Sequence, residues 1–419
     1  MSLTSAGGVN IIGGGLAGSL LAILLARRGF NVNVYERRPD PRHFVADAGR
    51  SINLALAARG IRGLKLAGVL DEVMRFALPM AGRMVHEHDG RAELQRYGVR
   101  PEEVIYSVSR SQLNRTLIRA AATYPNVQFK FRQLCLGIAP GRNTLEMRDE
   151  STGGIYQTER LPSIATDGAG SAVRDSMVSL EVSDVREEPL DHDYKELTIP
   201  AVKGKPVLEV NALHIWPRGG FMLIALPNPD ATFTATLFLA REGSNSFQQL
   251  KTAADVEAFF TREFPSARVL MPQLTAEFFE NPQGSLGTVY TRGWHVGSEV
   301  LLLGDAAHAI VPFHGQGMNC AFEDCAELVR LMDQHHGWAG LFEAFEHERR
   351  PNTDAIARMA LENYLEMRSA VLDPDYRRRK KEAEEREKQD PDAIPRYSAV
   401  MFHPEIPYRD VLELRSPRA

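Results

Sequence analysis

The chain has 419 residues, of which 44% are hydrophobic and 25% are charged, and its formal net charge is −5. This length exceeds one ordinary core and predicts two or three domains, and the composition is that of a soluble globular protein. The negative charge argues against a general nucleic-acid partner. The three cysteines, Cys135, Cys320 and Cys325, lack metal-type spacing and favour reduced thiols in the cytoplasm.

No membrane association is expected. The longest apolar run, from Leu16 to Ala26, is interrupted by Gly18 and Ser19. It falls short of the roughly 20 residues that a membrane span needs. The N-terminus has no basic segment ahead of an apolar one, so we expect no signal peptide.

The first nucleotide-binding signal lies near the N-terminus. The pattern predicts an apolar strand over 9–12, an apolar helix over 16–28 and a strand over 32–35 that ends at Glu36. The turn before the helix reads Gly-x-Gly-x-x-Gly, which permits a tight turn, close approach of a pyrophosphate to the backbone, and close helix packing. We therefore expect a dinucleotide, with Glu36 accepting hydrogen bonds from a ribose. The residues expected to bind it are Gly13, Gly15, Leu16, Ala17, Gly18, Glu36 and Arg37.

A second signal lies about 290 residues further along. An apolar strand predicted over 300–303 precedes Gly304-Asp305, and a Gly-x-Gly turn at 315–317 opens a new helix. A carboxylate at the C-terminal end of a central strand faces the crevice where ligands bind in open α/β sheets. The arrangement is similar to the one with which flavoprotein hydroxylases hold the ribityl chain and isoalloxazine of FAD. The expected FAD contacts here are Asp305, Gly315, Gly317, Met318 and Asn319.

Three further positions are candidates for the cofactor. Asp167 belongs to an Asp-Gly motif like one that flavoprotein hydroxylases associate with FAD and the pyridine nucleotide, although the motif alone is an ordinary turn. Arg50 and Arg110 are candidate flavin or phosphate contacts, with surface arginines as the alternative. No second Gly-x-Gly-x-x-Gly follows a strand, so NAD(P)H is expected to bind without a Rossmann domain of its own, and the sequence leaves the choice between NADPH and NADH open. His308 and His314 have no partners at ligand spacing, and no metal site is expected.

The remaining pattern predicts an inserted sheet and a helical end. Short β-rich runs fill 195–240, helical periodicity returns over 253–264, everything over 317–370 reads as helical, and 377–388 is a charged helix. The expected class is α/β: a Rossmann-like FAD-binding domain with an inserted mixed or antiparallel β-sheet substrate domain and C-terminal helices. The predicted FAD-binding domain is discontinuous, over 1–75, 100–180 and 290–365. The substrate domain covers 76–99 and 181–289, and a C-terminal helical segment covers 366–419.

Several longer runs resemble one family over almost the whole chain. The sequence is similar to kynurenine 3-monooxygenases, single-component flavoprotein hydroxylases with a p-hydroxybenzoate hydroxylase-like fold. The most specific runs are Tyr-Lys-Glu-Leu at 194–197, His-Ile-Trp-Pro-Arg at 214–218 and Phe-His-Gly-Gln-Gly at 313–317. Gly14 and Thr166 stand where similar proteins often have alanine. The membrane-anchoring C-terminal segment of eukaryotic members is not matched, which implies a soluble bacterial-type enzyme. We expect it to be a monomer or a homodimer.

The resemblance implies an FAD- and NADPH-dependent enzyme. It would use O2 to hydroxylate L-kynurenine ortho to the ring amine through a flavin C4a-hydroperoxide, so the flavin and not a protein base carries the chemistry. A carboxylate clamp is implied at Arg83 and Tyr97, with Asn363 and Tyr397 completing it. The aromatic end of the pocket is implied to consist of Phe238, Phe313 and His314.

Packing remains the alternative role for Tyr97 and Phe238. Two other functions also remain open at this point: hydroxylation of a ring-substituted kynurenine or related aminoaromatic acid, and a flavin-fold binding protein without turnover.

Overall fold

A six-stranded sheet forms the base of the nucleotide-binding part. The structure is a computed structural model that describes residues 7–43, 53–141, 144–368, 373–390 and 394–414. All neighbouring strands of this sheet are parallel except β18 and β19, the antiparallel pair at one edge. Its order is β18 (His295–Val296), β19 (Val300–Leu302), β12 (Ser163–Ala165), β1 (Gly8–Ile12), β2 (Asn31–Glu36) and β8 (Val127–Phe131). The strands predicted over 9–12, 32–35 and 300–303 are thereby confirmed.

Helix α1 (Leu16–Arg27) packs against this sheet and connects β1 to β2. Its residues from Gly18 to Ala26 are all buried, which explains why the helix is apolar on every side. The helix α4 (Arg110–Ala122) contacts α1. Ser109 is its N-cap, because the Ser109 hydroxyl accepts a hydrogen bond from the Gln112 backbone N–H at 3.4 Å.

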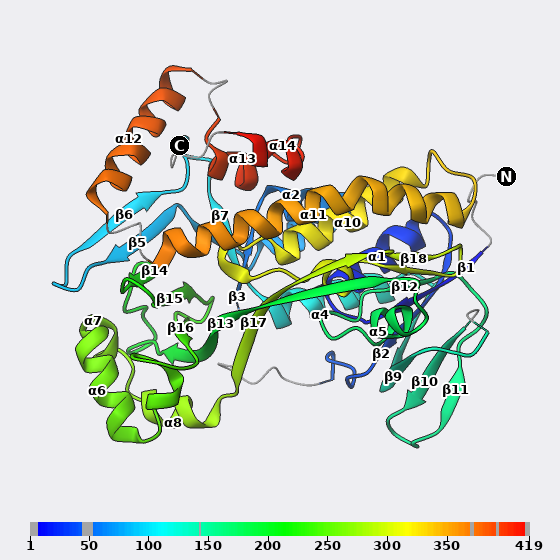
Figure 1. Cartoon of the computed structure of the whole chain (residues 1–419), viewed down its shortest axis with the longest axis horizontal. Coiled ribbons are helices and arrows are strands. Elements are labelled where there is room, and N and C mark those ends of the chain that lie inside the picture. Colours follow the sequence, from blue (N-terminus) through cyan, green and yellow to red (C-terminus); the bar gives the residue numbers. More distant parts are fainter. Residues whose placement is uncertain (1–6, 44–52, 142–143, 369–372, 391–393, 415–419) are drawn as a thin grey trace.

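A seven-stranded sheet forms the second part of the molecule. Its pairs are antiparallel except β5 and β14, so the expectation of a mixed or antiparallel sheet is confirmed. The order is β17 (Gln283–Arg292), β13 (Asp184–Ile199), β16 (Phe233–Ala240), β15 (Met222–Pro227), β14 (Ala212–Pro217), β5 (Gly82–His86) and β6 (Ala92–Arg96). The long strands β13 and β17 run across the middle of the molecule toward the six-stranded sheet (Figure 1).

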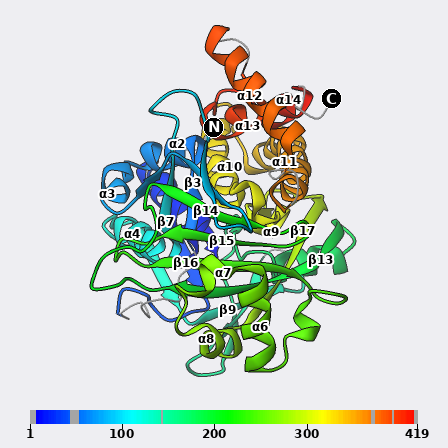
Figure 2. The ribbon, with the colours of Figure 1, turned by 90° about the vertical axis from the view of Figure 1, so that its left-hand side faces the viewer.

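The two faces of the seven-stranded sheet bury different partners. One face packs Trp216, Leu223 and Leu237 against a cluster of phenylalanines from α6 (Ala253–Glu263) and its neighbours. The other face presents Met222 and Phe238 to residues of the long helix α11 (Trp338–Arg368). Figure 2 shows β14, β15 and β16 between α10 and α11 on one side and α6 to α8 on the other.

The helical stretch predicted over 317–370 is interrupted. Helix α10 (Gly317–Leu331) ends before a short turn that contains Gly337, and α11 begins at Trp338. The prediction of continuous helix was therefore wrong over 332–337, where glycine and two histidines favour a turn over helix. The charged helix predicted over 377–388 is confirmed as α12 (Pro374–Gln389), and α13 (Arg396–Phe402) and α14 (Tyr408–Glu413) follow it.

Smaller elements connect these layers. Two three-stranded sheets contain β3 (Asn53–Leu56), β7 (Ile105–Ser109) and β4 (Leu78–Met80), and β11 (Ile155–Gln157), β10 (Leu145–Asp149) and β9 (Gln133–Ile138). The remaining helices are α2 (Ala58–Ala67), α3 (Leu70–Met74), α5 (Ala172–Ser179), α7 (Pro265–Arg268), α8 (Leu274–Glu280) and α9 (Asp305–His308), with 3-10 turns η1 (Phe247–Gln249) and η2 (Pro312–His314). Within the described ranges, every helix is too short or too polar to span a membrane.

Candidate active site

One cavity of about 880 Å³ lies between the two large sheets. At one end it is lined by the glycine turn at Gly15, the Asp305 region and the Gly315–Gly317 turn. At the other end it is lined by Arg83, Tyr97 and Tyr397. Segments that are hundreds of residues apart in the sequence therefore meet at a single site, whose volume is within the range of ordinary ligand pockets.

The glycine turn after β1 has the shape that a pyrophosphate requires. Gly13 has φ +102, and a Cβ there would lie 2.5 Å from the Thr166 carbonyl oxygen. A Cβ on Gly18 would lie 2.0 Å from the Gly13 carbonyl oxygen, so the third glycine allows α1 to pack closely. By contrast, a Cβ on Gly15 would meet nothing within 4 Å, because Gly15 faces the cavity. The roles expected of the three glycines match these surroundings.

The two departures from the family pattern have local explanations. Thr166 donates its hydroxyl to the Ile12 and Gly13 carbonyl oxygens, each at 2.9 Å, and so fixes the end of β1. A Cβ at Gly14 would lie 3.1 Å from Cβ of Glu36. The Glu36 carboxylate accepts the Gly14 backbone N–H at 2.8 Å and the Arg38 backbone N–H at 2.9 Å. Glu36 is thus fixed at the end of β2, where a ribose contact was predicted.

The second motif surrounds Asp305, the first residue of α9. Its carboxylate is exposed and lines the cavity, and the preceding Gly304 adopts φ +64. Gly315 also has positive φ, +65, and a Cβ there would lie 3.0 Å from Cβ of Ala55. These glycines let the backbone of the strand end and of the turn approach the cavity without side chains in between.

Asn319 has a different position from the one expected. It is fully buried behind the cavity, donates to the Ala55 and Gly315 carbonyl oxygens at 2.8 and 2.7 Å, and accepts the Ala57 backbone N–H at 2.9 Å. Asn319 thereby ties the Gly315 turn to β3. Gly317 and Met318 line the cavity directly.

The Asp-Gly motif lies beside the same cavity. Gly168 and Ala169 line it, whereas the Asp167 side chain faces the N-terminus of α5, and burial raises the pKa of Asp167. Arg174 donates to the Ala169 carbonyl oxygen at 2.6 Å and to the Ala306 carbonyl oxygen at 3.2 Å. Arg174, which the sequence did not single out, therefore connects this motif to the Asp305 helix.

The three arginines proposed from sequence for the cofactor differ in position. Arg110 is exposed and lines the cavity at the start of α4. Arg37 is exposed at the end of β2 and does not line the cavity. Arg50 lies outside the described residues. Taken together, the glycine turn, the Asp305 carboxylate and the open α10 N-terminus fit an FAD molecule, since they offer a pyrophosphate cradle, a hydroxyl acceptor and a positive helix end.

Arg83 occupies the opposite end of the cavity and is 5% exposed. Its guanidinium lies 4.9 Å from the ring centroid of Tyr397 and 5.8 Å from that of Tyr97. Nη2 is 3.5 Å from the Asn363 amide oxygen. The structure thus brings together all four residues of the implied clamp, which come from β5, the segment after β6, α11 and α13.

The ring side chains around the buried Arg83 guanidinium are neutral. Burial raises the pKa of Tyr97 and of Tyr397, so both phenols stay protonated and can donate hydrogen bonds. Burial lowers the pKa of His314 to about 3, and its ring stacks on Tyr397 with centroids 5.3 Å apart. A buried guanidinium with phenol donors at hand is a suitable binding site for a carboxylate.

Aromatic side chains form the wall beside the clamp. Phe238 and Phe313 both line the cavity and meet edge to face, with ring centroids 5.0 Å apart. Phe313 also stacks on Tyr364 at 4.1 Å. Asn363 does not line the cavity; it donates to the Phe313 carbonyl oxygen at 2.6 Å and so positions this wall as well as contacting Arg83.

Sequence reasoning missed two neighbours of the clamp. The Glu366 carboxylate lies 3.7 Å from the Arg83 guanidinium, and Met367 lines the cavity. Both follow Asn363 on α11 at i+3 and i+4, so they share its helix face. That spacing could have identified them once Asn363 was assigned.

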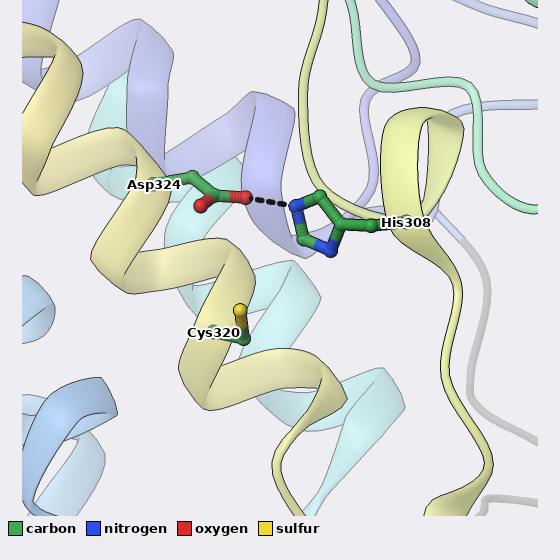
Figure 3. Close-up of side chains that lie close together, drawn as sticks. All are labelled: His308, Cys320 and Asp324. Atoms are coloured by element: carbon green, nitrogen blue, oxygen red, sulfur yellow. Dashed lines mark hydrogen bonds and ion pairs between the residues drawn. The ribbon is translucent and has the colours of Figure 1, made fainter. Parts of the chain in front are cut away.

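His308 has neighbours that its sequence spacing did not indicate. His308, Cys320 and Asp324 gather within 4.8 Å in the interior (Figure 3), and His308 Nε2 lies 2.7 Å from Asp324 Oδ2. Arg349 donates to the same carboxylate at 2.8 Å and to the Cys320 sulfur at 3.6 Å. Burial raises the pKa of the Cys320 thiol well above its usual value. These side chains therefore form a buried ion-pair network. The protonated thiol and the adjacent guanidinium both oppose the binding of a metal cation.

Comparison with known proteins agrees with this site. A family profile described as "FAD binding domain" matches residues 7–360. Among solved structures, 2-methyl-3-hydroxypyridine-5-carboxylic acid oxygenase superimposes with a TM-score of 0.70 at 20% identity, covering 89% of this chain and 95% of that one. p-Nitrophenol 4-monooxygenase from Pseudomonas putida DLL-E4 gives 0.72 at 16% identity, covering 95% and 97%. At these identities the similarity establishes the fold alone, which this chain shares with both proteins.

Curated relatives are far more similar in sequence. A kynurenine 3-monooxygenase of Myxococcus xanthus (strain DK1622) is 46% identical over 403 residues, covering 96% of this chain and 87% of the relative. Another, from Stenotrophomonas maltophilia (strain K279a), is 48% identical over 408 residues, covering 96% and 89%. Because relatives at 46% and 48% identity cover 96% of the chain and the FAD binding domain matches residues 7–360, the chain belongs to the kynurenine 3-monooxygenases, a family of FAD-dependent monooxygenases.

Proposed function

We propose that this enzyme hydroxylates L-kynurenine ortho to the ring amine, giving 3-hydroxykynurenine, with NADPH as reductant and O2 as oxidant. The observation that carries the proposal is the buried Arg83 with its two protonated phenols, at the far end of a cavity whose other end fits FAD. An amino-acid carboxylate would pair with the guanidinium, from which the Glu366 carboxylate lies 3.7 Å away.

The protein's own contribution is binding, orientation and exclusion of water. Bound FAD would take electrons from NADPH and deliver one oxygen atom of O2 to the ring. The clamp fixes one end of the substrate, and the Phe238–Phe313 wall holds the ring in an apolar environment. His314 is neutral near pH 7 because burial lowers its pKa to about 3, so it adds no charge beside the ring.

The alternative substrates are ring-substituted kynurenines and related aminoaromatic acids. The test is NADPH oxidation by the FAD-loaded enzyme, measured with a panel of kynurenines and other aromatic acids, with hydroxylated product and H2O2 quantified. We expect L-kynurenine to give the highest kcat/KM and close to one product per NADPH. A substituted kynurenine that is preferred, or NADPH oxidation that yields only H2O2 with every compound, would contradict the proposal.

A further inference from the structure

The floor of the cavity is one face of the seven-stranded sheet. Strands β14, β15 and β16 contribute five apolar side chains to it: Leu213, Met222, Ile224, Leu226 and Phe238. Two threonines of β16, Thr234 and Thr236, are the other lining residues from these strands. On the part of the floor that these three strands form, the two threonine hydroxyls can make specific polar contacts with a bound ligand.

The two threonine hydroxyls differ in what they already bind. The Thr234 hydroxyl accepts a hydrogen bond from the Asn228 side-chain amide at 3.2 Å. Among the residues that the structure describes, no partner is found for the hydroxyl of Thr236. Thr236 is half-buried, whereas its strand neighbours Ala235 and Leu237 are completely buried. It therefore owes its exposure to the cavity, as does Ile224, its cross-strand partner.

We propose that Thr236 is a specificity-determining residue that accepts a hydrogen bond from the ring amine of kynurenine. This inference rests on the proposed function. A substrate whose carboxylate is held at Arg83 on β5 extends its ring over β14 and β15 toward β16. Three strand spacings separate β5 from β16, which is about 14 Å between backbones. Side chains from both ends shorten this span, so an extended kynurenine brings its ring to the Ile224–Thr236 row.

The chemistry of the ring amine requires such an acceptor. In kynurenine the amine is ortho to the ketone, and one of its two N–H groups bonds internally to that ketone oxygen. The second N–H points away from the ketone and would be left without a partner on an apolar floor. An unpaired buried donor is costly, and a hydroxyl oxygen can accept this hydrogen bond.

Glu196 is the competing acceptor. It lies directly across from Thr236 on β13 and also lines the cavity. It is one strand further from Arg83, and its carboxyl interacts electrostatically with Arg110. The position nearer the clamp and the uncommitted hydroxyl favour Thr236.

The test compares two ligands in two proteins. L-Kynurenine and its analogue without the ring amine, 2-amino-4-oxo-4-phenylbutanoate, are titrated into the FAD-loaded enzyme by calorimetry without NADPH. In Thr236→Val, which preserves side-chain shape, we expect the preference for kynurenine over the analogue to fall roughly 3- to 10-fold. Affinity for the analogue should stay within about twofold, as expected for a neutral local change, and the flavin absorption spectrum should not change.

Three controls make the outcome unambiguous. Thr234→Val removes a hydroxyl that is already bonded, and it should leave the preference between the ligands unchanged. An unchanged preference in Thr236→Val, or equal losses for both ligands, would overturn the assignment. A loss of preference in Glu196→Gln, with none in Thr236→Val, would assign the amine to the carboxyl instead. If wild type binds neither ligand and NADPH oxidation is not stimulated, the proposed function itself fails.

Discussion

We expect substrate binding to depend most directly on Arg83. Arg83→Met should weaken L-kynurenine binding by about 1.5–3 kcal/mol, because a charge-assisted bond to the carboxylate is lost in a buried site. Arg83→Lys should recover only part of this loss, since an ammonium cannot reproduce the planar fork. Titration of the FAD-loaded enzyme would measure both, together with H2O2 formed per NADPH, which should rise as the substrate is misplaced.

The FAD content of the purified Arg83 variants is the control. It should equal that of wild type, because the clamp lies at the far end of the cavity from the glycine turn. Unchanged kynurenine affinity and unchanged H2O2 yield in Arg83→Met would refute the clamp and would weaken the kynurenine assignment with it.

Asp305 is the corresponding residue at the cofactor end. Its exposed carboxylate lines the cavity at the start of α9. Asp305→Ala should lower FAD affinity by about 1–3 kcal/mol, because cofactor hydroxyls would lose their acceptor in an enclosed site. The measurement is flavin fluorescence on titration of apoprotein, with circular dichroism as the check on folding. Wild-type FAD affinity in this variant would rule out the expected role.

Individual residues also show which parts of the site can be predicted from the sequence and which cannot. The Gly-Asp motif indicates Asp305, whereas only the resemblance indicates Arg83, and both residues line the cavity. Asn319 was expected to contact FAD, but its amide bonds to three backbone groups of β3 and the Gly315 turn. Such a positioning role depends on which backbone groups approach in three dimensions, and no local pattern encodes it. Glu366 was missed for a different reason: its i+3 spacing from Asn363 on α11 could have identified it.

The glycine turn and α1 give a prediction at the scale of one element. Gly15 and Gly18 belong to the same motif but have different surroundings. Gly18→Ala places a methyl group 2.0 Å from the Gly13 carbonyl oxygen, so it should lower the free energy of unfolding by about 1–3 kcal/mol or more. Gly15→Ala meets nothing within 4 Å and should leave stability unchanged while FAD affinity falls, since the methyl group enters the ligand's space.

Urea unfolding of the apoproteins and FAD titration separate these two effects. The two variants serve as controls for each other, because both replace glycine by alanine in one turn. Equal destabilisation of both apoproteins would contradict the division between packing and ligand space. FAD binding by Gly15→Ala that is as tight as that of wild type would contradict this division as well.

At this scale the β-α-β unit was predictable because its signals are local: strand, turn and helix succeed each other within about 30 residues. The break between α10 and α11 was not, because apolar periodicity continues on both sides of it. The clamp is harder still, since Arg83, Asn363 and Tyr397 come from three distant segments. Only the resemblance linked them, and the packing of α11 and α13 against the sheet explains why they meet.

The buried ion-pair network joins the parts of the whole molecule. Arg349 of α11 lies 2.7 Å from Glu323 and 2.8 Å from Asp324 of α10. Asp324 in turn accepts the Gly304 backbone N–H at 3.2 Å, next to the Asp305 motif. Arg59 of α2 pairs with Glu323 and donates to the Ile406 carbonyl oxygen ahead of α14, each at 2.5 Å. The C-terminal segment, the long helices and the cofactor motif therefore depend on one set of charges.

The acid stability of the fold should reflect this network. Burial alone would raise the pKa of Asp324, but His308 and Arg349 outweigh it and hold the pKa below its usual value. A lowered folded pKa means that the carboxylate stabilises the fold above its unfolded pKa of about 4, and that this contribution is lost as pH falls through the folded pKa. Stability should therefore decline in acid below about pH 4.

Arg349→Met tests the network directly. It leaves the buried Asp324 with only His308 and the buried Glu323 with only Arg59 as charge partners, so the free energy of unfolding at pH 7 should fall by about 3–5 kcal/mol. Without Arg349, only His308 opposes the effect of burial on the Asp324 pKa, so this pKa should rise and the midpoint of acid unfolding should move to higher pH.

Arg350→Met is the matched control. Arg350 follows Arg349 on α11, but its side chain is partly exposed and its ion pair with Glu346 is long, at 3.9 Å. Its loss should change the free energy of unfolding by no more than about 0.5 kcal/mol. Urea unfolding at pH 7 and an acid titration followed by circular dichroism measure both. Similar small effects of the two substitutions would mean that the buried charges do not hold the molecule together.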